Sequence, residues 1–266
     1  MRNLVVVGLL LALVMPNLVL GQTDFDGTWK IDLNKSQLPT TTQVFLLQNG
    51  TYQCKSCVPM IKVKADATDQ TVSGSPYFDT IGIRVVDERS IEETRKKNGK
   101  VVAVSKMTVS PDGNTAAWEY TDDNYTTAAA VVGRNSMVRI GKSKRSAGPH
   151  AISGSWRFSK METLSDNALT FTLRVEDGML SMTSLIGESY SAKLDGTEAP
   201  YKGDPRISSV SVRKLSKGTF EETDLHDGKA IRVKRMMIDP ANLKTVNTIV
   251  TDNLTGASAL LVASKQ

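Results

Sequence analysis

The chain has 266 residues, of which 40% are hydrophobic and 23% are charged, a composition typical of one large or two small globular domains. Its formal net charge of +5 is spread along the sequence without a long run of one sign, which argues against nucleic acid as a partner. With only two histidines and two cysteines, the chain offers few ligands for metal sites and few bases for histidine-dependent catalysis.

The first 21 residues have the pattern of a cleavable secretory signal. Arg2 supplies a basic head, an apolar run covers 4–15, and Val19-Leu20-Gly21 precedes a cleavage site at Gln22. The run is too short to span a bilayer, and no later stretch reaches the ~20 apolar residues that a spanning helix needs. We therefore expect a secreted or periplasmic protein without a transmembrane segment after cleavage; a retained N-terminal anchor is the alternative.

Two long segments of the chain resemble each other. IEETRKKNGKVVAVSKMTVSPDG at 91–113 aligns with FEETDLHDGKAIRVKRMMIDPAN at 220–242, a shift of 129 residues. The shared residues include Glu-Glu-Thr, Gly-Lys, a Met and a Pro. Because this period is far longer than that of solenoid repeats, each copy is a domain. We expect a tandem duplication with units 22–141 and 152–266 joined by a linker at 142–151.

The local pattern throughout is that of β-strands. Asn98-Gly99 and Asp227-Gly228 separate alternating runs, which is the strongest short-range signal for a type I′ hairpin. Only 163–169 is compatible with one short helical turn. Many short strands at this spacing predict an all-β sandwich or barrel.

Hairpin pairing across these turns places one acid and one base on a shared, otherwise apolar face of each unit. A two-residue loop pairs Glu93 with Val104, and Glu222 with Val233. The side chains that then share a face as candidate ligand-binding residues are Glu93 and Lys106 in the first unit, and Phe220, Glu222, Ile231, Val233 and Arg235 in the second. In one interpretation, which we favour, the charges lie near strand ends in water. In the other they point into a barrel as a paired polar spot.

The motif Gly-x-Trp opens both units, as FDGTWK at 25–30 and ISGSWR at 152–157. Gly27 and Gly154 allow close approach of another group, and the indoles of Trp29 and Trp156 are suited to fill the closed end of a small barrel. A cation from the last strand of each unit is expected over the indole face. The candidates are Arg139 for Trp29 and Lys265 for Trp156.

At these residues the sequence resembles the calycins, the group of lipocalins and fatty-acid-binding proteins. FDGTWKIDLNKS and ISGSWRFSKM look like the opening strand of that group. The resemblance implies two tandem antiparallel up-and-down β-barrels with room for apolar ligands in their lumens. The whole chain also looks like secreted bacterial proteins made of two lipocalin-like repeats.

Cys54 and Cys57 form the short motif CKSC, which has no counterpart in the second unit. In an oxidising compartment a disulfide is the expected state, and it requires a turn at Lys55-Ser56. A redox site or a metal site are the alternatives, but zinc needs two further ligands, and only His150 and His226 remain. We expect a structural disulfide, no metal and no cofactor.

No catalytic motif is present, and neighbouring acids such as Glu92-Glu93 point to opposite faces of a strand. We therefore expect a non-catalytic protein that binds a small hydrophobic ligand in one or both barrels. The alternatives are a structural or interaction module of the cell envelope with filled barrels, and a redox-active protein using Cys54 and Cys57.

Overall fold

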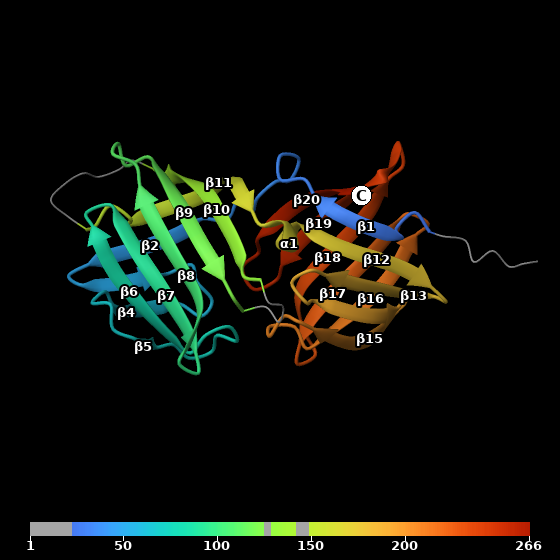
Figure 1. Cartoon of the computed structure of the whole chain (residues 1–266), viewed down its shortest axis with the longest axis horizontal. Coiled ribbons are helices and arrows are strands. Elements are labelled where there is room, and N and C mark those ends of the chain that lie inside the picture. The colour runs from blue at the N-terminus through green and yellow to red at the C-terminus, as the bar shows by residue number, and fades with distance from the viewer. Residues whose placement is uncertain (1–22, 125–128, 142–148) are drawn as a thin grey trace, which may run out of the picture.

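The computed structural model describes residues 23–124, 129–141 and 149–266, which form two ten-stranded antiparallel sheets (Figure 1). The expected all-β class is confirmed. The proposed signal at 1–21 and most of the linker at 142–151 lie outside the described residues. Within the described ranges, no helix has the length and apolar character needed to cross a membrane.

The first sheet, here called the N-terminal barrel, is barrel-like with the strand order β4-β3-β2-β11-β10-β9-β8-β7-β6-β5. Consecutive strands pair except β4 and β5, which lie at the two ends of this order, and β11 joins β10 to β2. The strands are β2 (Gln43–Gln48), β3 (Thr51–Cys54), β4 (Ile61–Lys64), β5 (Gln70–Thr71), β6 (Thr80–Asp87), β7 (Ser90–Lys97), β8 (Lys100–Val109), β9 (Thr115–Asp122), β10 (Val131–Ile140) and β11 (Gly154–Leu164).

The second sheet, here called the C-terminal barrel, is closed. A single turn of helix, α1 (Asp166–Leu169), leads into it at the position where the sequence allowed one. Its strands are β1 (Gly27–Ile31), β12 (Thr170–Glu176), β13 (Met179–Ser184), β14 (Ser189–Lys193), β15 (Asp195–Lys202), β16 (Ser209–Ser216), β17 (Thr219–His226), β18 (Lys229–Asp239), β19 (Asn242–Asp252) and β20 (Ser258–Lys265).

The opening strands of the two sequence units are exchanged between the barrels. β1 lies between β12 and β20 of the C-terminal barrel, and β11 lies between β10 and β2 of the N-terminal barrel. The expected boundaries at 22–141 and 152–266 are corrected accordingly: the N-terminal barrel is built from the contiguous strands β2–β11, and the C-terminal barrel from β12–β20 together with β1. The exchange is possible because the two Gly-x-Trp strands are alike, so each fits either barrel.

Because of the exchange, each indole contacts the cation that was predicted for the other indole. The Lys265 ammonium lies 5.3 Å from the Trp29 ring centroid, and the Arg139 guanidinium lies 4.0 Å from that of Trp156. Both indoles are fully buried, as expected, and each donates its N–H to a backbone carbonyl four residues earlier, at 2.9 and 2.8 Å. The predicted pairs, Arg139 with Trp29 and Lys265 with Trp156, were wrong because they assumed that each Trp strand closes its own unit.

The expected hairpins form with the backbone conformation that their sequences predict. Asn98 and Gly99 have φ values of 50° and 77°, and Asp227 and Gly228 have 49° and 75°, so both turns are type I′. The core divides into one apolar cluster for each barrel, with Trp156 in the N-terminal cluster and Trp29 in the C-terminal one.

The exchange predicts which fragments of the chain fold. A fragment of residues 38–165 contains all strands of the N-terminal barrel, whereas the sequence unit 22–141 lacks β11 and leaves β10 and β2 without their shared partner. We expect 38–165 to melt cooperatively, as followed by circular dichroism, and 22–141 to show no cooperative transition. Equal melting of both fragments would contradict the exchange.

The glycines before the two tryptophans are predicted to be irreplaceable. Gly27 and Gly154 have φ values of 137° and 139°, and a Cβ at either position would overlap the cationic side chain of Lys265 or Arg139. We expect Gly27→Ala and Gly154→Ala each to lower the free energy of unfolding by about 3 kcal/mol, from backbone strain and the displaced cation. As a control, Gly99→Ala at an open turn position should cost about 1 kcal/mol. Urea denaturation measures the free energy of unfolding of each variant. If Gly27→Ala and Gly154→Ala cost no more than Gly99→Ala, a Cβ at these positions does not displace Lys265 or Arg139.

Candidate ligand-binding site

A β-bulge follows each type I′ turn and shifts the strand register by one residue. The irregularity lies between Arg95 and Lys96 in the N-terminal barrel, and between Asp224 and Leu225 in the C-terminal barrel. As a result Glu93 pairs with Ser105 instead of Val104, and Glu222 pairs with Lys234 instead of Val233. Bulges of this kind turn the following side chains to the opposite face. The predicted acids are therefore placed with different neighbours from those expected.

Glu93 points into the N-terminal barrel and is 5% exposed. Its Oε1 accepts a hydrogen bond from Arg95 Nε at 2.5 Å, and the Arg95 guanidinium lies 4.8 Å from the centroid of the Phe78 ring. Our preferred interpretation, that the acids lie in water near strand ends, was therefore wrong. The alternative of a paired charge inside the barrel is correct for Glu93, with Arg95 as the base.

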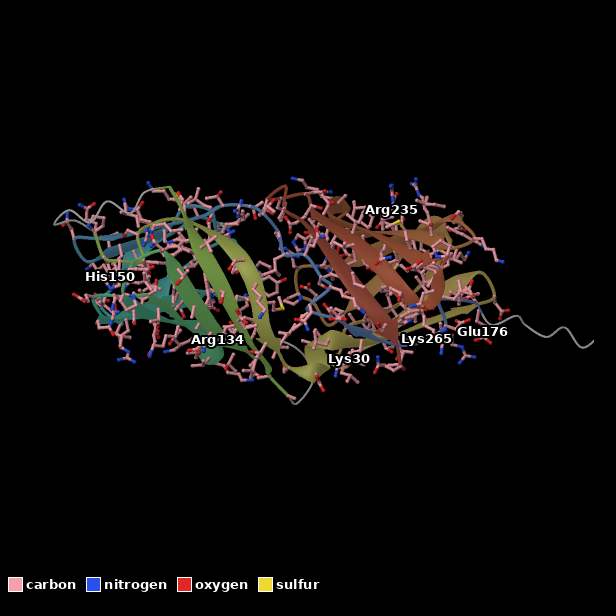
Figure 2. All side chains as sticks on the ribbon, turned by 90° about the horizontal axis from the view of Figure 1, so that it is seen from above. Lys30, Arg134, His150, Glu176, Arg235 and Lys265 are labelled. Atoms are coloured by element: carbon pink, nitrogen blue, oxygen red, sulfur yellow. A yellow bond between two sulfur atoms is a disulfide. The ribbon has the colours of Figure 1, made fainter. Side chains whose placement is uncertain are left out.

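Lys106, the base expected beside Glu93, lies instead on the outer face. It pairs across the sheet with Glu92 on β7 and with Glu119 on β9. Glu92 forms an ion pair with Arg84, and Glu119 forms one with Arg134, so charges of alternating sign follow one another across the outer face. Arg134 lies on the outside of the barrel in Figure 2. Lys106 is therefore not part of a site in the lumen.

Inside the N-terminal barrel lies a cavity of about 220 Å³. One part of its wall is aromatic: the Trp118 ring centroid lies 5.7 Å from that of Phe45 and 6.4 Å from that of Phe158. The other part is polar and carries two carboxylates, a guanidinium and a carboxamide. The residues lining the cavity are Glu93, Arg95, Ala103, Val104, Ser105, Trp118, Tyr120, Thr121, Asp122, Asn135 and Phe158.

Asn135 carries the one polar atom of this lining that is buried without a hydrogen-bond partner among the described residues. It pairs with Trp118 across β9 and β10, and its Oδ1 accepts no hydrogen bond. A buried carbonyl oxygen without a donor costs free energy, which is recovered when a water or a ligand donates to it. The cavity therefore combines an apolar wall with an available acceptor.

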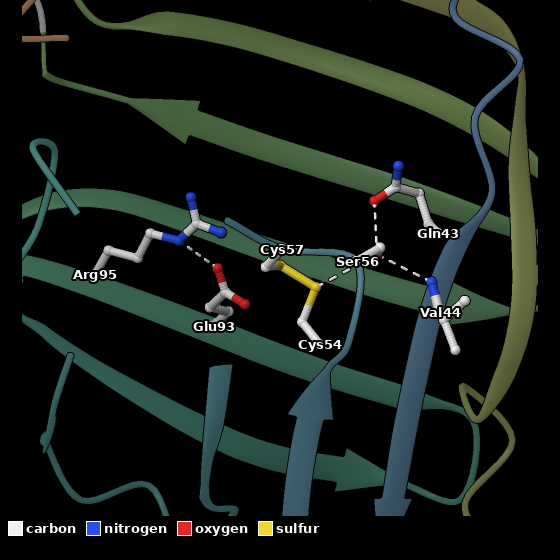
Figure 3. The surroundings of a disulfide bond; sticks show 7 residues. All are labelled: Gln43, Val44, Cys54, Ser56, Cys57, Glu93 and Arg95. Carbon is white, nitrogen blue, oxygen red and sulfur yellow. Dashed lines mark hydrogen bonds and ion pairs between the residues drawn. A yellow bond between two sulfur atoms is a disulfide. The ribbon is translucent and has the colours of Figure 1, made fainter. Parts of the chain in front are cut away.

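The disulfide lies beside this cavity, as Figure 3 shows. Cys54 and Cys57 have a Cα–Cα distance of 5.4 Å, and Cys54 is fully buried in the core of the barrel. Ser56 in the turn between them accepts a hydrogen bond from the Val44 N–H at 3.0 Å and donates to Gln43 Oε1 at 3.1 Å. The turn that the sequence required at these residues is present, and it attaches the disulfide loop to β2.

A second hollow of about 520 Å³ lies at the junction of the two barrels. It shares Asn135 and Phe158 with the lumen cavity as lining residues. The rest of its lining comes from Met161 on β11 and from three further segments: the stretch at 38–43, the disulfide loop through Ser56 and Val58, and the turn between β19 and β20 through Leu254, Thr255 and Ala257. Both barrels therefore contribute to the lining of this hollow.

The lumen of the C-terminal barrel contains a network of paired charges. Lys234 Nζ lies 2.6 Å from Glu222 Oε1 and 3.3 Å from Asp224 Oδ2, and Arg232 Nε lies 2.5 Å from the same Asp224 oxygen. Tyr190 donates its hydroxyl to Glu222 Oε2 at 2.6 Å. Glu222 is 2% exposed and Asp224 is fully buried. Two acids and two bases thus neutralise each other inside the barrel.

The pKa values in this network follow from burial and pairing. Burial raises the pKa of Glu222, against the lowering effect of Lys234. Burial alone would also raise the pKa of Asp224, but the two cations Lys234 and Arg232 together bring it below its ordinary value. Burial, and next the charge of Glu222, raise the pKa of Tyr190 well above that of a free tyrosine.

The other residues predicted for the second unit divide between core and surface. Phe220 and Ile231 are buried, as a lumen assignment requires. Arg235 pairs with Glu221 on the outside of the barrel, as seen in Figure 2, and Val233 shares its strand face. The sequence analysis missed Asp224, although it lies two residues after Glu222 and therefore shares its face. Further side chains of the two lumens, which only the bulges or the tertiary fold bring there, were not predicted: Arg95, Trp118, Tyr120, Asp122, Asn135, Tyr190, Arg232 and Lys234.

Comparison with models of known protein families finds no match to this chain. Comparison with curated protein sequences finds no similar protein either.

The register of β18 gives a matched pair of substitutions. Lys234→Met removes the shared partner of two buried carboxylates, and we expect it to lower the free energy of unfolding at pH 7 by about 3–5 kcal/mol. Arg235→Met on the outer face breaks only an exposed pair and should cost about 0–1 kcal/mol. Urea denaturation measures both, and similar small losses would contradict the register.

The Lys234→Met loss should also depend on pH. The pKa of Glu222 is already raised above its ordinary value of 4.5 in the native protein, and it rises further without Lys234. A folded-state pKa above the unfolded one favours folding as the pH falls through the folded value. We therefore expect the loss to be smaller at pH 5 than at pH 7, and an equal loss at both would show that Glu222 does not titrate in this range.

Proposed function

We propose that the protein binds a small, largely apolar ligand in the lumen of the N-terminal barrel, without catalysing a reaction. The observation that supports this best is the cavity of about 220 Å³ with Trp118 and Phe158 on its wall. Binding cavities in proteins are concave and combine apolar walls with placed polar groups. This space has an aromatic wall and a polar wall with two carboxylates, a guanidinium and a carboxamide.

The difference between the two barrels explains why one lumen is hollow. At the repeat shift of 129 residues, Ala103 and Ser105 of the N-terminal barrel stand where the C-terminal barrel has Arg232 and Lys234. The short side chains leave open the space that the two long cations occupy in the other barrel. A duplicated unit has thus retained the fold while one copy has room for a ligand.

The size of the cavity limits the ligand. An apolar cavity of about 150 Å³ accepts benzene, so about 220 Å³ fits one six-membered ring with a short substituent. The resemblance of the Gly-x-Trp strands to the calycins agrees with a ligand held inside a barrel, and with a secreted carrier or sensor. The C-terminal barrel, filled by its charge network, then acts as the structural partner.

A structural or interaction module remains the second candidate for the C-terminal barrel, supported by the mutual neutralisation of Glu222, Asp224, Arg232 and Lys234. A catalytic role is not proposed, since Glu93 is engaged by Arg95 and both histidines lie away from the cavity lining. For Cys54 and Cys57 we propose a structural role at the rim of the cavity, with redox activity as the alternative.

Neighbouring substitutions on β8 test the site. Ser105→Phe places a ring in the cavity, whereas Lys106→Phe places the same ring on the outer face. We expect 2-phenylethanol to bind the wild type, as followed by quenching of tryptophan fluorescence, and Ser105→Phe to lower its affinity at least about tenfold. Lys106→Phe should leave the affinity within about twofold.

Native mass spectrometry of the freshly purified protein gives a second readout. A small molecule that co-purifies with wild type and Lys106→Phe but not with Ser105→Phe supports the proposal. Unchanged binding by Ser105→Phe, or no binding by the wild type, would refute it.

A further inference from the structure

The charged side chains that line the cavity have a net negative charge. Arg95 is its one cationic side chain and is already paired with Glu93, their atoms 2.5 Å apart. Asp122 is the remaining charge, and it forms no ion pair with any described residue. Its Oδ1 accepts hydrogen bonds at 2.9 Å from the backbone N–H and the side-chain amide of Asn124, which are neutral donors. The cavity therefore carries one net negative charge.

The influence of Asp122 reaches into the cavity. The pKa of Tyr120 is raised, first by burial and then by the charge of Asp122. Tyr120 itself lines the cavity and lies over Gly133, where a Cβ would overlap its ring. The carboxylate thus acts on the polar end of the same space that Trp118 and Phe158 enclose at the other end.

The lining also contains a neutral acceptor without a hydrogen-bond donor, the side-chain oxygen of Asn135. Asn135 Oδ1 is buried and accepts no hydrogen bond, and it lies on the strand next to Trp118. A ligand that donates an N–H to this oxygen satisfies it, whereas a ligand with only acceptors leaves it unsatisfied. The acceptor is independent of the net charge, and it favours a ligand that carries a donor over one that carries only acceptors.

Aromatic faces attract cations because their ring quadrupole is negative above the plane. Trp118, Tyr120 and Phe158 give the cavity three such rings. An anion would instead meet Asp122 and Asn135 Oδ1, and Arg95 would have to exchange its bond to Glu93 for one to the ligand.

From this arrangement we infer that the ligand is an organic cation, an arylalkyl amine whose ammonium group lies at Asp122 while its ring packs towards Tyr120 and Trp118. The inference rests on the proposed function and adds the chemical class of the ligand. Cations of this class have a compact ring and two or three further atoms, which is what the cavity volume admits.

Three probes of one shape and different charge test the inference with the mature protein of residues 22–266. Isothermal titration calorimetry at pH 7 compares 2-phenylethylammonium, 2-phenylethanol and 3-phenylpropionate. We expect the ammonium compound to bind at least about tenfold more tightly than the alcohol, and the carboxylate to bind most weakly.

Adjacent aspartates supply the variant and its control. Asp122→Asn removes the unbalanced charge, and we expect it to reduce the ammonium preference about tenfold while leaving the alcohol affinity unchanged. Asp123→Asn changes the net charge equally but at a residue outside the cavity lining that pairs with Lys100, and it should retain the preference. Unchanged alcohol binding shows that each variant still has a folded cavity.

The outcomes separate this inference from the proposed function. Equal binding of all three probes, or tightest binding of the carboxylate, overturns the cation assignment and leaves binding in the N-terminal barrel intact. Equal loss of the ammonium preference in both variants also overturns it, because a general surface charge would then account for the effect. No binding of any probe refutes the proposed function together with the inference.

Discussion

The contact between a buried indole and a cation from the neighbouring strand is present at the end of each barrel, and in both barrels it joins strands from different sequence units. Trp29 meets Lys265, and Trp156 meets Arg139, with a glycine two residues before each indole leaving space for the cationic side chain. Since each of these Trp strands comes from the other sequence unit, the two halves are joined by pairing as well as by the linker. Neither sequence unit of the tandem duplication therefore contains all the strands of a barrel.

Features that depend on neighbouring residues were predictable from the sequence. The type I′ hairpins follow from Asn98-Gly99 and Asp227-Gly228, and burial of both tryptophans follows from their motif. The strand exchange was not predictable, because the two motifs are interchangeable and each barrel offers a strand that ends in a cation.

The candidate site shows a similar division. Alternation identified Glu93 and Glu222 as side chains that share a face with apolar residues, which is correct, but a bulge of one residue moved their bases from Lys106 and Arg235 to others. A bulge changes the face of every residue beyond it, and neither hairpin sequence contains a residue that predicts the bulge. The cavity itself depends on the volumes of Ala103 and Ser105 relative to their repeat partners, which is a difference between two lumens and not a motif.

The exchanged strand also orders the assembly of the molecule during synthesis. All strands of the N-terminal barrel are contiguous and are complete once β11 has left the ribosome, so this barrel can close while the rest is still being made. β1 emerges first of all but has its partners in β12 and β20, and its backbone is joined to the end of the chain by a hydrogen bond from Gln266 N–H to the Thr28 carbonyl. Closing so long a loop carries a high entropic cost. The C-terminal barrel is therefore the later of the two to form, because β1 can complete its pairing only after β20 has been synthesised.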